Sequence, residues 1–164
     1  MSMNLSQFDT PRDQRYFEDY HKGAEYQFGP IEVEENELIE FARRFDPQSI
    51  HIDPDAAARG PFNGLIASGW HTVGLMMRLY VDHYVTSVAS LASPGVDEVR
   101  WRVPVRPGDQ LRLRVSTVET RLSRSKPDRG LVHSRLEAIN QNDEVVATLT
   151  AMNLIARREP GEAA

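Results

Sequence analysis

The chain has 164 residues, of which 40% are hydrophobic and 26% charged, so it suits one domain with a genuine core. It contains no cysteine, which excludes disulfides, thiolate metal sites and a cysteine nucleophile. The formal net charge of −5 argues against a nucleic-acid partner. No stretch approaches the roughly 20 apolar residues of a membrane helix, and the amino terminus lacks a secretion signal. We therefore expect a cytoplasmic protein with no membrane partner.

The polar ends of the chain predict three segments. We expect a flexible leader over residues 1–15, a single domain over 16–157 and a flexible tail over 158–164. The domain begins with a strand over 25–33 and an amphipathic helix over 34–45. Four apolar residues recur at helical spacing in this helix: Leu38, Ile39, Ala42 and Phe45.

Two further helices follow. Asp53 and Pro54 are typical of an N-cap and a first helical position, so a short helix is expected from there. A long helix over 66–84 has apolar residues on more than one side, which predicts that it is largely buried. Its apolar residues are expected to fill the core: Val73, Leu75, Met76, Met77, Leu79, Tyr80 and Tyr84.

The second half of the chain alternates apolar and polar residues, which predicts four successive strands. They cover about residues 96–105, 111–123, 131–140 and 144–156. In the first two strands, the side chains expected to point inward are Val99, Trp101, Val103, Val105, Leu111, Leu113, Val115 and Val118. Helices early and strands late indicate an α+β domain in which one antiparallel sheet covers the long helix.

One candidate for chemistry lies between the first two helices, where Asp46 and His51 are five residues apart. A carboxylate and an imidazole both accept protons from water, and one of them can later donate a proton. The alternative is structural: Asp46 caps a turn and His51 is a polar residue near the core. Asp53 is assigned to helix capping.

A second candidate is Gly69, near the start of the long helix. The first turn of a helix carries backbone N–H groups without intrahelical partners, and these can receive a developing oxyanion. Glycine at this place lets a ligand carbonyl approach the backbone closely. The alternative is that Gly69 permits tight packing of the helix on the sheet.

The remaining patterns are less specific. We find no phosphate loop, dinucleotide fingerprint or metal-ligand spacing, so no cofactor and no metal are expected. Four arginines alternate along two of the predicted strands: Arg100, Arg102, Arg112 and Arg114. They mark a solvated strand face or serve an anionic ligand such as a CoA phosphate.

Residues 45–51, with the sequence FDPQSIH, resemble the signature of the MaoC-like dehydratases. This hot-dog-fold group includes R-specific enoyl-CoA hydratases. Asp46, Ile50 and His51 match its aspartate, aliphatic residue and histidine, and Ala57 stands at its small residue six positions later. Phe45 replaces a glycine of the signature.

The resemblance continues downstream over most of the domain. Gly69 matches the glycine that opens the family's central helix, whereas Ser68 stands where the family has histidine. Gln48 stands where the signature has asparagine, and residues 99–111 are similar to the family's strand leading into a Pro-Val-x-x-Gly-Asp turn.

The resemblance implies a hot-dog fold, an antiparallel sheet wrapped around a long helix. It further implies a homodimer or an assembly of dimers, and an acyl-CoA thioester as substrate. Asp46 and His51 would activate water, which adds to carbon 3 of a trans-2-enoyl-CoA and gives the (3R)-hydroxyacyl-CoA. The Gly69 N–H would hold the thioester oxygen. Gln48 and Ser68 are expected to take part in substrate binding.

Two other functions remain open. Other hot-dog proteins are thioesterases that hydrolyse acyl-CoA, commonly with water placed by a lone carboxylate. The Asp46–His51 pair favours hydration over that reaction. The second alternative is a protein that binds acyl-CoA without catalysis, for which Asp46 would be dispensable.

Overall fold

The computed structural model describes residues 4–160. Within this range the strands are β1 (Glu25–Glu32), β2 (Ser90–Trp101), β3 (Gln110–Leu122), β4 (Arg129–Ile139) and β5 (Val145–Ala156). The α-helices are α1 (Glu35–Phe45), α2 (Ser49–Ile52), α3 (Pro54–Ala58) and α4 (Gly69–His83), and two single turns of 3₁₀ helix span Arg12–Gln14 and Phe17–Asp19. No helix in the described part is long and apolar enough to cross a membrane.

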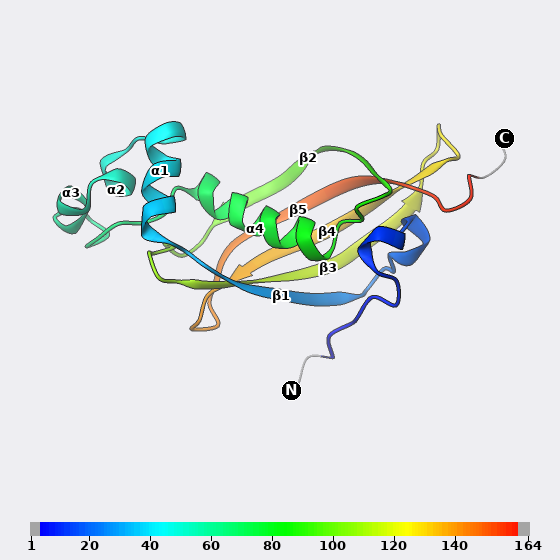
Figure 1. Ribbon diagram of the computed structural model, residues 1–164, viewed down its shortest axis with the longest axis horizontal. Helices are drawn as coiled ribbons and strands as arrows, with labels where there is room; N and C mark the ends of the chain where they lie inside the picture. Colours follow the sequence, from blue (N-terminus) through cyan, green and yellow to red (C-terminus); the bar gives the residue numbers. More distant parts are fainter. Residues whose placement is uncertain (1–3, 161–164) are drawn as a thin grey trace.

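The strands form one antiparallel sheet in the order β1-β3-β4-β5-β2, and α4 lies along one face of it (Figure 1). The predicted α+β architecture is thereby confirmed. Apolar side chains of α4 and of the sheet fill a common core between them. The buried apolar residues of α4 are Leu75, Met76, Leu79 and Tyr80. Met77 was expected in the core, but 38% of it is exposed, because it lies on the flank of the helix that the sheet leaves uncovered.

Three other side chains expected to be inward are exposed. Trp101 is 48% exposed, because it ends β2 beyond the packed part of the core. Val118 is exposed because the alternation that buries Leu111, Leu113 and Val115 continues at Thr117, whose hydroxyl pairs with Tyr84. Phe45, at the end of α1, is 62% exposed, whereas Leu38 and Ala42 of the same helix are buried.

Helices α1, α2 and α3 form a lobe beside the start of α4 (Figure 1). The expected capping role of Asp53 is confirmed, since its carboxylate accepts from the backbone N–H groups of Asp55 and Ala56. β2 begins at Ser90, six residues before the predicted start. Pro94 and Gly95 interrupt the alternating sequence pattern, whereas the strand continues through them with shifts in its pairing with β5.

The predicted leader, residues 1–15, packs against the domain where the structure describes it. Arg15 is buried and donates to the carbonyls of Thr10, His83 and Tyr84, and the ring of Phe8 stacks on Tyr26. Of the predicted tail, Arg158 pairs with Asp19. Residues 1–3 and 161–164 lie outside the described residues.

Candidate active site

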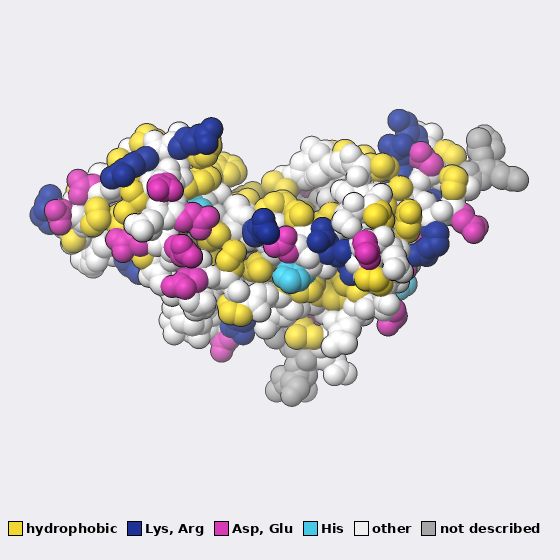
Figure 2. Space-filling view, viewed as in Figure 1, with side chains coloured by type: hydrophobic (Ala, Val, Ile, Leu, Met, Phe, Trp, Pro, Cys, Tyr) yellow, Lys and Arg dark blue, Asp and Glu magenta, His cyan; other side chains and the backbone are white. Residues whose placement is uncertain are grey.

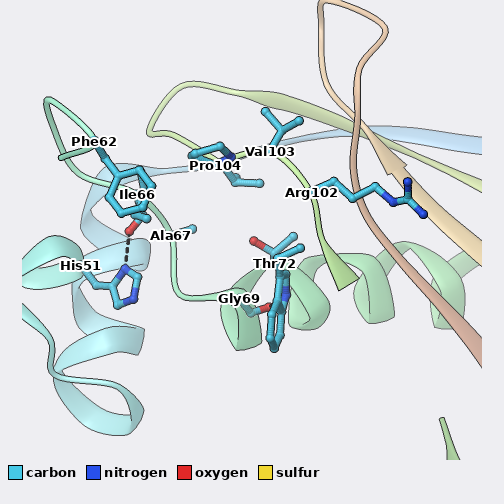
Figure 3. A pocket seen from close by; sticks show the side chains of 11 residues that line it. His51, Phe62, Ile66, Ala67, Gly69, Thr72, Arg102, Val103 and Pro104 are labelled. Atoms are coloured by element: carbon cyan, nitrogen blue, oxygen red, sulfur yellow. Dashed lines mark hydrogen bonds between the residues drawn. The ribbon is translucent and has the colours of Figure 1, made fainter. Parts of the chain in front are cut away.

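Asp46 and His51 face each other at the junction of α1 and α2. Nε2 of His51 lies 3.4 Å from Oδ2 of Asp46, and His51 is 5% exposed. Nδ1 of His51 is 2.7 Å from the backbone carbonyl of Ile66 (Figure 3). A carbonyl only accepts, so Nδ1 donates to it, and Nε2 is the ring nitrogen directed at Asp46. In the neutral form of the ring, Nε2 is then an acceptor.

Two side chains hold the carboxylate of Asp46. Gln48 donates through Nε2 to Oδ1 at 2.7 Å, and the Ser68 hydroxyl donates to Oδ2 at 2.7 Å. These two hydrogen bonds, that of Gln48 first, lower the pKa of Asp46 below its ordinary value. Asp46 is therefore ionised at neutral pH. Beside it, Nε2 of His51 supplies a second acceptor, so one water molecule could donate one O–H to each.

Gln48 and Ser68 were both predicted to bind substrate. The structure places each of them against Asp46, and Ser68 is completely buried. Their contacts therefore favour a role in orienting Asp46.

Gly69 is the first residue of α4, and no described residue accepts a hydrogen bond from its N–H. That N–H is available at the positive end of the helix dipole. The other side of Gly69 is occupied by Trp101, whose indole Nε1 donates to the Gly69 carbonyl at 2.9 Å. A Cβ added at Gly69 would overlap the indole ring. Close packing of α4 on the sheet therefore requires glycine at residue 69. This requirement holds whether or not the Gly69 N–H binds a ligand.

A cavity of about 300 Å³ joins these elements (Figure 3). It brings His51 of α2 together with the start of α4 and the chain that follows β2. The lining residues are His51, Phe62, Ile66, Ala67, Gly69, Thr72, Trp101, Arg102, Val103, Pro104 and Val105. Apolar side chains dominate the wall, which suits an apolar group of a ligand. Asp46, Gln48 and Ser68 are not part of this lining.

The four alternating arginines separate into different environments, and Arg100 is exposed on β2. Arg112 pairs with Asp143 and Arg114 with Glu137, as expected for a solvated strand face. Arg102 instead lines the cavity.

Some residues of the site carried no signal in the sequence. The Ile66 carbonyl is a backbone group, and Trp101 looked like one more inward residue of an alternating strand. Trp101 reaches Gly69 only because β2 ends beside the start of α4.

The comparisons with known proteins agree with one another. A family model described as MaoC like domain matches residues 19–140. The chain is 27% identical over 121 residues to protein YdeM of Bacillus subtilis, which covers 74% of this chain and 84% of YdeM. It is 40% identical over 74 residues to 3-hydroxyacyl-thioester dehydratase Z of Mycobacterium tuberculosis, covering 44% of this chain and 49% of that protein.

Solved structures show the same likeness. The MaoC-like dehydratase from Rhodospirillum rubrum superposes with a TM-score of 0.81 at 35% identity, covering 88% of this chain and 99% of that one. The R-hydratase PhaJ1 from Pseudomonas aeruginosa shares the fold, with a TM-score of 0.68 at 20% identity over 88% of this chain and 86% of its own. The chain belongs to the MaoC-like dehydratase family and has its hot-dog fold.

Proposed function

We propose that the chain is a hydro-lyase that adds water reversibly to a trans-2-enoyl-CoA and forms the (3R)-hydroxyacyl-CoA. One observation carries this proposal: the two acceptors of Asp46 and His51 meet at 3.4 Å beside an apolar cavity that also contains Gly69. The relatives named as a hydroxyacyl-thioester dehydratase and an R-hydratase support the same class of reaction.

The first step follows from the hydrogen-bonding capacity of the pair. Ionised Asp46 and neutral His51 each accept one O–H of a water molecule, which directs an oxygen lone pair towards carbon 3 of the substrate. Nε2 of His51 takes a proton as the new C–O bond forms. Positioned acid–base groups of this kind contribute about 10²–10⁴-fold to the rate.

The second step concerns the electrons displaced from the carbon–carbon double bond. They pass through carbon 2 to the thioester oxygen, which becomes enolate-like. The Gly69 N–H donates to that oxygen, and a preorganised donor of this type stabilises the transition state by ~3–4 kcal/mol. The proton that His51 took from water is then transferred to carbon 2, which completes the addition of water and restores the neutral ring.

We further propose that two copies assemble into a homodimer in the cytoplasm, or into an assembly of such dimers. β2 is an edge of the sheet, and both β2 and α4 expose apolar side chains. Those exposed on the two elements are Trp70, Met77, Val81, Leu91, Val96 and Trp101. Figure 2 shows the surface hollowed beside the helical lobe, with hydrophobic side chains along the hollow.

The test is the loss of ultraviolet absorbance of the conjugated thioester, with crotonyl-CoA and a longer trans-2-enoyl-CoA. Asp46→Asn and His51→Ala should each abolish the loss while thermal melting shows that they remain folded. Asp53→Asn is the matched control, because Asp53 caps α3 and should leave turnover intact.

Two results would reject the proposal. Release of free CoA without hydration would make the chain a thioesterase. Binding of acyl-CoA with equal affinity by the wild type and Asp46→Asn, without turnover of any enoyl-CoA, would make it a binding protein.

A further inference from the structure

Trp101 stands at a position that the proposed reaction does not use. It is the last residue of β2, and its ring lines the same cavity as His51. Figure 3 shows His51, Phe62 and Ile66 on one side of this cavity, with Gly69 and Thr72 across from them. Trp101 contacts Gly69, so its ring is part of the cavity wall at the start of α4.

Three contacts fix the indole ring. Nε1 donates to the Gly69 carbonyl at 2.9 Å. The ring occupies the space that any side chain at residue 69 would need. The ring also meets Trp70 edge to face, with the ring centroids 5.4 Å apart. Swinging the ring away would break the hydrogen bond and lose both packing contacts.

A wall that is held in this way limits the space for a substrate. The cavity of about 300 Å³ lies at the small end of the range for ligand sites. Other apolar walls are provided by Phe62 and Ile66 and by the segment 103–105, but Trp101 is the bulkiest side chain in the lining.

We propose that Trp101 is a specificity-determining residue that restricts this chain to short acyl groups. The inference rests on the proposed hydratase function and concerns the same cavity. Removing the indole ring opens the cavity towards α4 and β2, so longer acyl chains gain apolar contacts there while short ones lose them.

The activity test compares kcat/KM for crotonyl-CoA and trans-2-decenoyl-CoA. In Trp101→Ala the ratio of decenoyl to crotonyl activity should rise about tenfold or more, as expected when an apolar pocket gains room for methylene groups. Trp101→Phe keeps a smaller ring and should give an intermediate ratio. Leu122→Ala is the control, since Leu122 is an exposed side chain of β3 outside the lining and without contact to Trp101, and it should keep the wild-type ratio.

A second readout does not depend on turnover. The chain has two tryptophans, so Trp70→Phe leaves Trp101 as its single indole emitter. Titration with unreactive butyryl-CoA should change the fluorescence emission of Trp70→Phe. In Trp101→Phe the only remaining indole is that of Trp70, and its emission should change weakly. Decanoyl-CoA should bind Trp101→Ala about tenfold more tightly than it binds the wild type.

The two readouts separate the possible failures. If these binding changes occur but no enoyl-CoA is hydrated, the proposed hydratase function is rejected. Trp101 would then still be the residue that limits the length of the bound acyl group. If Trp101→Ala and the wild type hydrate enoyl-CoA with the same ratio of decenoyl to crotonyl activity, the hydratase function stands and the role of Trp101 in specificity is overturned. An equal loss of kcat/KM for both chain lengths in Trp101→Ala and Trp101→Phe would also overturn it, because Trp101 would then only support Gly69.

Discussion

The hydroxyl of Ser68 donates to Oδ2 of Asp46, the same carboxylate oxygen that faces Nε2 of His51. Ser68 is also the N-cap residue of α4, so a single residue connects the Asp46–His51 pair to the helix start that carries Gly69. The position of Asp46 and His51 and that of the Gly69 N–H are therefore linked through one buried side chain.

Ser68→Ala removes one of the two hydrogen bonds that lower the pKa of Asp46. We expect this pKa to rise, so the acidic limb of the kcat/KM profile should move to higher pH, and kcat/KM should fall about 10- to 100-fold as Asp46 loses its orientation. Gln48→Ala should move the limb in the same direction. A loss of activity with an unchanged limb would favour the substrate-binding role first predicted for Ser68.

Gly69→Ala should destabilise the fold, because the added Cβ overlaps the ring of Trp101. Overpacking of this kind costs about 1–3 kcal/mol in the free energy of unfolding. The cost should largely disappear when the same change is made in Trp101→Ala, where the ring is absent. Urea unfolding of the two single variants and the double variant measures this coupling. Equal costs in both backgrounds would contradict the contact.

His71 of α4 is buried against Phe41 of α1, and neither ring nitrogen has a hydrogen-bond partner among the described residues. Burial lowers its pKa from the ordinary value of 6.5, while Glu37, at 3.9 Å from Nε2, opposes the shift. A lowered pKa means that the unfolded chain binds the proton more readily. The contribution of His71 to the free energy of unfolding is thus fully present above pH 6.5. It is lost as the pH falls through the pKa of His71 in the folded state.

His71→Phe should remove this dependence. The phenyl ring can keep the stacking on Phe41 without an unpaired polar group, so the variant should gain about 1 kcal/mol near pH 7 and more near pH 5. Urea unfolding at the two pH values checks it. Identical pH dependence of the unfolding free energy in the variant and the wild type would contradict the role assigned to His71.

Val81→Glu should weaken the proposed homodimer. Val81 and Met77 are one helical turn apart on the uncovered flank of α4, and a carboxylate there would be buried against the second copy. Light scattering should then report monomers at concentrations where the wild type is dimeric. The control is Val118→Glu, which changes an exposed valine on the outward side of β3, and this variant should stay dimeric.

Periodicity predicted most of the fold. The alternation of apolar and polar residues predicted four of the strands, and the helical spacing of apolar residues predicted α1 and α4. Both patterns could be recognised because they involve residues that are close together in the sequence. The same patterns do not tell which flank of an element its partners will cover. Phe45 and Met77 were therefore expected inside and lie exposed.

The sequence by itself determined the α+β class, the order of the elements and the proximity of Asp46 and His51, which are joined by only a few residues. Tertiary structure alone decided that Ser68 donates a hydrogen bond to Asp46 and that Trp101 donates one to the Gly69 carbonyl. The latter pairs are 22 and 32 residues apart, and they meet because the sheet brings the end of β2 and the helical lobe to the start of α4. Contacts of that range depend on how whole elements pack, which no local pattern records.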